Sequence, residues 1–219
     1  KKEKLTKNVL FNGFKELRKI WRKLKEDKPM RTYLSAFFVY SMAVQTIMLI
    51  ATYFGIEELD WGTTDSTTGL IVSILLIQLV AVLGAWLTSK ASAKFGNIQT
   101  LIVINCIWIA ICIYAYTITS PFQFYFTAAF VGLVMGGIQS LSRSTYSKLI
   151  PEGEKDTASY FSFYDVSEKI GIVIGMSTYG FIADQYNIRN AILFFIVFFI
   201  VGVILLFFVP RKRIVEQAE

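Results

Sequence analysis

The chain contains no histidine, and only two of its 219 residues are cysteine. Without histidine there is no Ser-His-Asp hydrolase triad, no His-ligated haem and no H-E-x-x-H zinc site. Cys106 and Cys112 are six residues apart in one apolar run, so on a helix they lie on different faces and form neither a disulfide nor a metal pair. The nucleotide-binding pattern G-x-x-x-x-G-K-[ST] is also missing. The sequence therefore predicts a protein that is not an enzyme and that uses no cofactor and no metal.

Charge is scarce as well. Charged residues make up 17% of the chain, against about 25% in soluble domains. Hydrophobic residues reach 54%, and phenylalanine alone supplies 19 residues. This composition is typical of a membrane protein with several spans. The net charge is +6, and the basic residues responsible for it flank apolar runs. This placement predicts membrane lipid as a partner and argues against nucleic acid.

Six apolar runs reach about 20 residues or more, the length that crosses about 30 Å of hydrocarbon. They cover residues 33–54, 69–89, 97–117, 122–149, 158–182 and 190–209. The chain thus divides into a leader (1–31), a six-helix transmembrane part (32–210) and a tail (211–219). The leader carries twelve Lys or Arg residues. Its apolar residues recur at helical spacing and are expected on one face: Leu10, Phe14, Leu17, Trp21 and Leu24. It is expected to form a basic amphipathic helix in the headgroup plane, with a solvated leader as the alternative.

The basic residues in the connections predict the orientation of the spans. Alternate connections hold 12, 2, 3 and 3 Lys or Arg residues on one side, against 0, 0 and 1 on the other. Six spans with both termini in the cytoplasm satisfy this distribution. The protein is therefore expected to be an integral membrane protein of the bacterial inner membrane. Its leader and its tail are expected in the cytoplasm.

Charged residues inside the fifth run are the strongest local signal. Its charge-free part, residues 170–183, extends for only about 21 Å of helix, which is too short to cross the bilayer. The membrane must therefore include or approach Asp165, Glu168 and Lys169. Asp165 and Glu168 share a helix face, and Lys169 is placed to pair with Asp165. Because an unpaired charge at depth costs at least about 2.5–3.5 kcal/mol, these groups should face a wet cavity or a partner.

Arg143 in the fourth run is the expected partner. It lies eight residues before Pro151, and Asp165 lies about as far beyond the start of the next run. Antiparallel helices would place both side chains at similar depth. A bridge from Arg143 to Asp165 or to Glu168 is predicted, as part of a gating or substrate path. The alternative is that Arg143 snorkels to the interface.

Uncharged polar residues and glycines complete the set of candidates. Gln45, Gln78 and Gln139 are expected either on the substrate path or in ordinary hydrogen bonds between helices. Small residues at G-x-x-x-G spacing allow close helix approach in lipid. The predicted packing glycines are Gly132, Gly136, Gly171, Gly175 and Gly180.

The third and sixth runs are almost uniformly apolar, whereas the other four are mixed. Two mixed helices and one apolar helix, repeated once, indicate two three-helix units, which in one bundle have opposite topology. The predicted fold class is an all-α membrane protein with six transmembrane helices as two inverted three-helix repeats. A basic amphipathic interfacial helix precedes them.

Several motifs resemble one known family. Residues 136–144 (GGIQSLSRS), followed by Leu149-Ile150-Pro151, resemble the tenth helix of the vacuole-effluxer branch of the major facilitator superfamily. Residues 161–165 (FSFYD), with Lys169 after them, resemble the eleventh helix of that branch. Residues 89–96 look like a degenerate copy of the cytoplasmic G-x-L-A-D-R-x-G loop, with Ala93 at the position of its acid.

The resemblance covers residues 32–210 and implies the C-terminal six-helix half of a twelve-helix transporter. Residues 1–31 are then the linker between halves, and the first, second, fourth and fifth runs line the cavity. The function implied is efflux of a small solute, amino acids or related metabolites, by alternating access. The expected partners are membrane lipid, a small-molecule substrate and the N-terminal six-helix half. An isolated half, with its cavity face uncovered, is expected to self-associate.

Two other hypotheses remain open at this stage. One is a self-contained six-helix channel or a homodimeric small transporter. The other is a non-transporting scaffold with the facilitator fold. The chain begins at Lys1 rather than at methionine, as expected of a piece of a longer protein, and this favours the transporter half.

Overall fold

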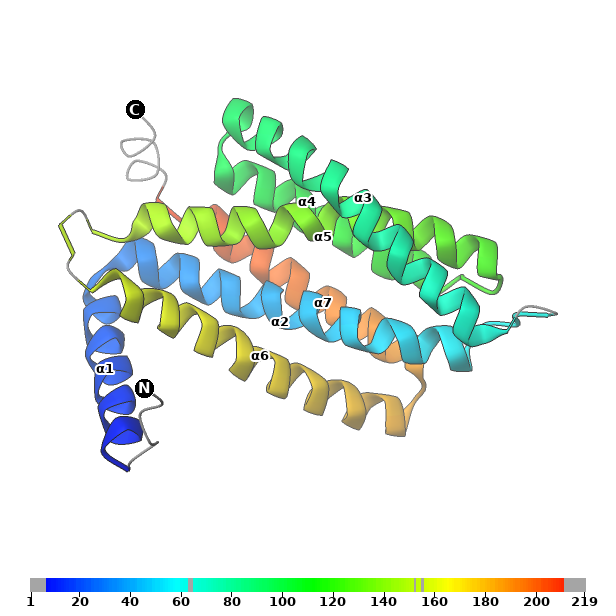
Figure 1. Ribbon diagram of the computed structural model, residues 1–219, viewed down its shortest axis with the longest axis horizontal. Coiled ribbons are helices and arrows are strands. Elements are labelled where there is room, and N and C mark those ends of the chain that lie inside the picture. The colour runs from blue at the N-terminus through cyan, green and yellow to red at the C-terminus, as the bar shows by residue number, and fades with distance from the viewer. Residues whose placement is uncertain (1–6, 63–64, 152, 155, 211–219) are drawn as a thin grey trace, which may run out of the picture.

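The computed structural model describes residues 7–62, 65–151, 153–154 and 156–210, with side chains described from Lys15 onward. Seven helices run through them: α1 (Lys7–Glu26), α2 (Lys28–Glu57), α3 (Ser66–Phe95), α4 (Asn97–Ala115), α5 (Pro121–Leu149), α6 (Thr157–Gln185) and α7 (Ile188–Phe207). Helices α2 to α7 run roughly along one axis, and α1 lies across one end of this bundle (Figure 1). Residues 1–6 and the predicted tail, 211–219, are outside the described residues.

The helix ends follow local chemistry. The side chain of Asp27 accepts a hydrogen bond from the Met30 backbone N–H at the start of α2, and Asp65 caps α3 in the same way. Ser120 and Gln123 form a reciprocal capping box at the start of α5. Gly96, at φ +88°, separates α3 from α4 without an intervening loop, a backbone conformation that glycine adopts readily.

Five of the described helices are long and apolar enough to cross a membrane: α2, α3, α4, α5 and α7. Five of the predicted apolar runs are therefore confirmed as helices of membrane-spanning length. Helix α6 has 29 residues, the same number as α5, but it is not among the five. Asp165, Glu168 and Lys169 interrupt its apolar sequence, so the sixth span remains a prediction.

The helices pack as two linked groups. Helix α2 contacts α6 and α7, helix α5 contacts α3 and α4, and α4 also contacts α7. Trp108 of α4 stacks on Phe199 of α7 with ring centroids 5.8 Å apart, and both side chains are fully buried. The outer face of α3 stays open, with Leu79, Val82 and Leu83 exposed. The bundle thus has a continuous apolar core and a large apolar surface.

Helix α1 is docked on the bundle through one of its faces. Ile20 and Leu24 are buried, and Trp21 stacks on Phe163 of α6. The Lys23 Nζ donates a hydrogen bond to Glu154 Oε2 at 2.6 Å. This bond raises the pKa of Lys23 and lowers the pKa of Glu154, because it favours the charged form of each group. An ion pair thus links α1 to the α5–α6 connection.

Candidate functional site

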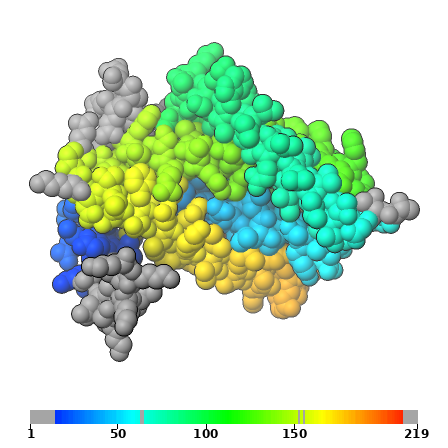
Figure 2. All heavy atoms as spheres, viewed as in Figure 1, coloured from blue at the N-terminus to red at the C-terminus, as the bar shows by residue number. Residues whose placement is uncertain are grey.

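A cavity of about 550 Å³ opens between α2, α5 and α6. In the space-filling view, the hollow between α5 and α6 has α2 at its floor (Figure 2). Helix α2 contributes Gln45 to the lining, α5 contributes Gln139 and Arg143, and α6 contributes Glu168 and Lys169. The cavity therefore carries both signs of charge together with neutral amides.

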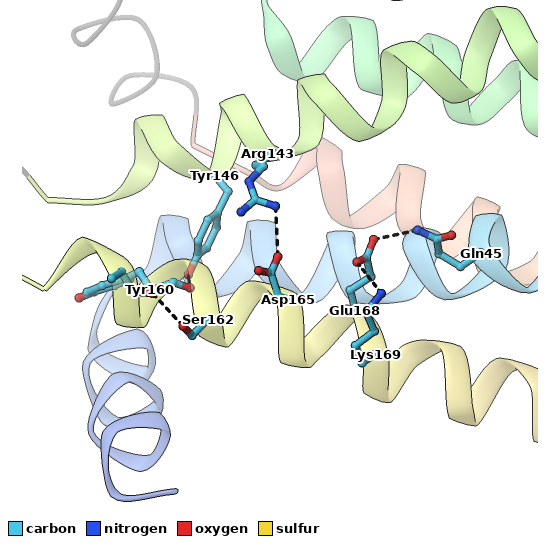
Figure 3. Close-up of polar contacts among 9 residues, drawn as sticks. Gln45, Arg143, Tyr146, Tyr160, Ser162, Asp165, Glu168 and Lys169 are labelled. Carbon is cyan, nitrogen blue, oxygen red and sulfur yellow. Dashed lines mark hydrogen bonds and ion pairs between the residues drawn. The ribbon is translucent and has the colours of Figure 1, made fainter. Parts of the chain in front are cut away.

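Arg143 bridges α5 and α6 at this cavity. Its Nη1 donates to Asp165 Oδ1 at 3.2 Å (Figure 3). The guanidinium also lies over the Phe161 ring, 5.1 Å from its centroid. The two side chains are 55% and 48% exposed, so water reaches the pair. Arg143 lines the cavity, whereas Asp165 is not among its lining residues. Of the two acids that the sequence offers as partners for Arg143, the structure pairs it with Asp165.

Glu168 has a separate set of partners, one turn deeper along α6. Its Oε1 accepts a hydrogen bond from Gln45 Nε2 of α2 at 2.8 Å, and its Oε2 lies 3.7 Å from Lys169 Nζ (Figure 3). The Glu168 side chain is 20% exposed, whereas that of Lys169 is 72% exposed. Lys169 thus approaches the adjacent Glu168; among the ion pairs of the described residues, it does not pair with Asp165, four residues earlier.

An aromatic floor supports these charges. The Tyr33 hydroxyl donates to the Ser142 carbonyl oxygen at 2.7 Å, and the Tyr40 hydroxyl lies 2.7 Å from Ser142 Oγ. Phe37 stacks on Tyr164 with centroids 4.0 Å apart. Sequence reasoning did not select these residues. A signal was present, because Tyr33 and Tyr40 are seven residues apart and so share one face of α2.

The third glutamine candidate lies elsewhere. Gln45 and Gln139 line the cavity, but Gln78 is exposed on α3 and is not part of its lining. The α3 face that carries Gln78 is one of the surfaces left uncovered by the described residues.

The predicted packing glycines of α5 lie against α3. A Cβ at Gly132 would stand 2.7 Å from the Ile77 carbonyl oxygen, and one at Gly136 would collide with the Ala81 carbonyl oxygen. At both positions the added Cβ would lie closer to the carbonyl oxygen than real Cβ atoms lie to their neighbours. The absence of a side chain is therefore what allows the two backbones to approach.

The predicted glycines of α6 differ among themselves. A Cβ at Gly175 would collide with Thr46 of α2, whereas one at Gly171 would make an ordinary contact of 3.5 Å with Met42. At Gly180, none of the described residues lies within 4 Å of the added atom. Close approach between α6 and α2 thus depends on Gly175.

The whole chain, residues 1–219, matches the family described as vacuole effluxer Atg22 like. It is 28% identical to an uncharacterised MFS-type transporter of Bacillus subtilis, YxiO, over 97% of this chain and 48% of that protein. It is 27% identical to autophagy-related protein 22 of Saccharomyces cerevisiae, over 97% of this chain and 42% of the yeast protein. The chain therefore spans about half the length of these relatives, or less.

The fold has a counterpart among solved structures. The Escherichia coli fucose:proton symporter superposes with a TM-score of 0.64 at 22% identity, over 88% of this chain and 45% of the symporter. This likeness concerns the fold, and it again covers about half of the larger molecule. Transporters of this superfamily are not enzymes, so the expectation that the chain is not an enzyme is confirmed.

Proposed function

The chain belongs to the vacuole effluxer Atg22-like family, and from this premise we propose that it is the C-terminal six-helix half of a twelve-helix secondary transporter. The membrane-spanning helices and the relatives make it an integral membrane protein. The relatives are about twice as long as this chain, which leaves room for a second half of similar size. The open cavity on α2, α5 and α6 supports the proposal, because a path between two halves would need such a face on each.

The helix contacts favour α6 as the sixth span. Helix α6 packs on α2 as α3 packs on α5, and α7 packs on α2 as α4 packs on α5. Exchanging α2–α4 with α5–α7 reproduces the same scheme, as expected for two inverted repeats. The acids Asp165 and Glu168 point to α5 and α2 rather than to lipid, so they do not prevent α6 from crossing (Figure 3).

The proposed substrate is a small zwitterionic solute, amino acids or related metabolites, and the proposed mechanism is alternating access. Arg143 and Lys169 offer cationic groups to a carboxylate, and Asp165 and Glu168 offer anionic groups to an ammonium. A substrate that competes for these partners would break the bridges between α5, α6 and α2. Breaking them would release the three helices to move relative to each other. Asp165 and Glu168 are the two candidates for a coupling proton.

Flux in proteoliposomes tests this proposal. The chain would be reconstituted together with its missing N-terminal half, and labelled amino acids would be offered with and without a pH gradient. We expect gradient-dependent flux that falls at least about a hundredfold in Asp165→Asn or in Glu168→Gln, in the range typical of losing a proton-transfer group. The matched control is Asp184→Asn, which makes the same change at an exposed acid near the far end of α6.

The outcomes separate the rival functions. Coupled flux that survives both Asp165→Asn and Glu168→Gln would contradict the proposed coupling site. Flux by this chain alone would favour a self-contained channel or a homodimeric transporter. A folded assembly that moves no amino acid would remove the proposed substrate class and would favour the non-transporting scaffold.

A further inference from the structure

A second hollow lies at the end of the bundle where α1 docks. It is a groove of about 600 Å³ between α1, α2 and α6. Phe38 and Ser167 line this groove, whereas their sequence neighbours Phe37 and Glu168 line the charged cavity. Successive helix residues are about 100° apart, so the two hollows lie on different sides of the α2–α6 contact. If the charged cavity faces the missing half of the transporter, the groove faces the bilayer.

The interior of the groove is apolar. Its lining includes Leu34, Phe38 and Val39 of α2, with Phe163 and Ile170 of α6. No Asp or Glu is among the lining residues. Such a surface accepts a hydrocarbon chain and offers nothing to a cation.

Two basic residues stand at the mouth, where α1 turns into α2. Arg31 Nη1 donates to the Lys25 carbonyl oxygen at 3.2 Å, which holds the guanidinium at this elbow. The Lys25 ammonium lies 5.6 Å from the centroid of the Trp21 ring. Neither residue belongs to an ion pair among the described residues, unlike Lys23, two residues before Lys25. Two positively charged side chains thus line one groove, and neither is in an ion pair among the described residues.

The dimensions correspond to part of one leaflet. From Arg31 to Val39 the α2 axis rises by about 12 Å, and one leaflet contributes about half of a 30 Å hydrocarbon core. Trp21 beside the mouth is a residue type that is enriched at the membrane–water interface. The charged mouth and the apolar interior therefore match the headgroup and the acyl region in order and in spacing.

We propose that this groove binds one anionic phospholipid of the leaflet at the α1 end of the bundle. The phosphate lies between Lys25 and Arg31, and an acyl chain lies along Phe38, Val39 and Ile170. The planar guanidinium suits phosphate because it donates two parallel hydrogen bonds. The lipid would contact α1, α2 and α6 at once and so would hold the linker helix against the bundle. This inference needs the membrane placement of the chain but not its transport activity.

Lipid retention by the full chain in mild detergent tests the proposal. Native mass spectrometry would count the lipids retained after addition of phosphatidylglycerol, phosphatidylcholine or inorganic phosphate, and thermal unfolding would be followed in parallel. We expect one phosphatidylglycerol to bind about tenfold more tightly than phosphatidylcholine, because each Lys or Arg near an anionic headgroup adds attraction. Inorganic phosphate should not raise the unfolding temperature, since it lacks the acyl chain.

Two variants address the two parts of the site. The double variant Lys25→Ala/Arg31→Ala should lose the preference for phosphatidylglycerol. Ser35→Trp, which places a large ring in the groove, should lose retention of either lipid while keeping both charges. The matched control is Lys90→Ala/Lys94→Ala, which removes the same net charge from the end of α3 and leaves the groove intact.

Three results would overturn the proposal. One is equal retention of the two lipids by the unaltered chain. The second is a phosphatidylglycerol preference that survives in both groove variants. The third is a lipid-free dimer that only Ser35→Trp disrupts, since this would identify a second copy of the chain as the occupant of the groove.

Discussion

Arg189 ties together three helix ends on the side of the bundle opposite to α1. Its Nε donates to Glu58 Oε2 at 2.6 Å, and its Nη1 donates to the Tyr116 carbonyl oxygen at 2.7 Å. The guanidinium also lies over the Phe54 ring. One side chain from the start of α7 thus holds the end of α2 and the end of α4. It is also the one basic residue that the charge count assigns to this side, and Glu58 neutralises it.

We expect Arg189→Gln to lower the free energy of unfolding by about 2 kcal/mol, because charged hydrogen bonds to partly buried groups are lost. The side chains of Arg189 and of its partner Glu58 are only 19% and 24% exposed. The comparison variant is Arg143→Gln, whose more exposed pair should contribute at most about 1 kcal/mol. Unfolding in detergent, with Glu58→Gln to complete a double-mutant cycle, measures the difference. Equal costs for the two arginines would contradict this account of the Arg189 clamp.

At the scale of single residues, sequence reasoning reached the partners of Arg143 but not the choice between them. Counting residues from the ends of two antiparallel helices places Arg143 at a depth similar to that of Asp165 and Glu168. Which acid it meets depends on how the helices are rotated, and on Gln45 of α2, which binds Glu168. The rotation of α2 is a property of the whole packing. The Tyr33 and Tyr40 contacts with Ser142 escaped prediction for the same reason.

At the scale of secondary-structure elements, α3 and α5 pack against each other in close contact. A Cβ at Gly84 of α3 would collide with the Leu133 carbonyl oxygen, and one at Gly136 of α5 would collide with that of Ala81. Both obstacles are backbone atoms, which cannot turn aside as a flexible side chain can. The two helices therefore contact each other through paired glycine surfaces.

Gly136→Ala should destabilise the protein by about 1–3 kcal/mol, since overpacking forces the backbones apart. Gly180→Ala is the control, because an added methyl there meets nothing among the described residues. The control should be neutral, or stabilising by about 0.5–1 kcal/mol, as alanine is the better helix former. Unfolding of both variants in the same detergent gives the comparison. Similar destabilisation by both would show that helix propensity, rather than the α3–α5 contact, governs these positions.

Helix positions were predictable because apolar length is recorded directly in the sequence. The run 33–54 lies inside α2, and the run 122–149 coincides with α5 to within a residue. The docking of α1 was not predictable from its amphipathic pattern alone. Of the residues on its expected apolar face, Leu24 is buried but Trp21 is half exposed, and the buried Ile20 was not assigned to that face. Which of these side chains become buried depends on where α6 begins and where Phe163 lies, and the α1 sequence does not contain this information.

Two uncovered surfaces of the described residues contrast in their chemistry. One is the charged cavity face of α2, α5 and α6, and the other is the apolar face of α3. A lipid bilayer would cover the apolar face, but it would not cover a cavity lined by Arg143, Glu168 and Lys169. The cavity face therefore requires either water or another protein surface.

We expect the chain alone to self-associate through its cavity face, and co-expression with the proposed N-terminal half to replace this homodimer by a one-to-one complex. Light scattering in detergent reports the stoichiometry, and a cysteine at Gln139, in a Cys106→Ser background, reports the face. Disulfide formation through that cysteine should occur in the homodimer and disappear in the complex. Ser177→Cys is the control: nine residues from Glu168, it lies about 900°, or half a turn net, round α6 on the opposite face. Cross-linking through Ser177→Cys alone, or a monodisperse monomer, would contradict the prediction, because the polar cavity would then be open to water without cost.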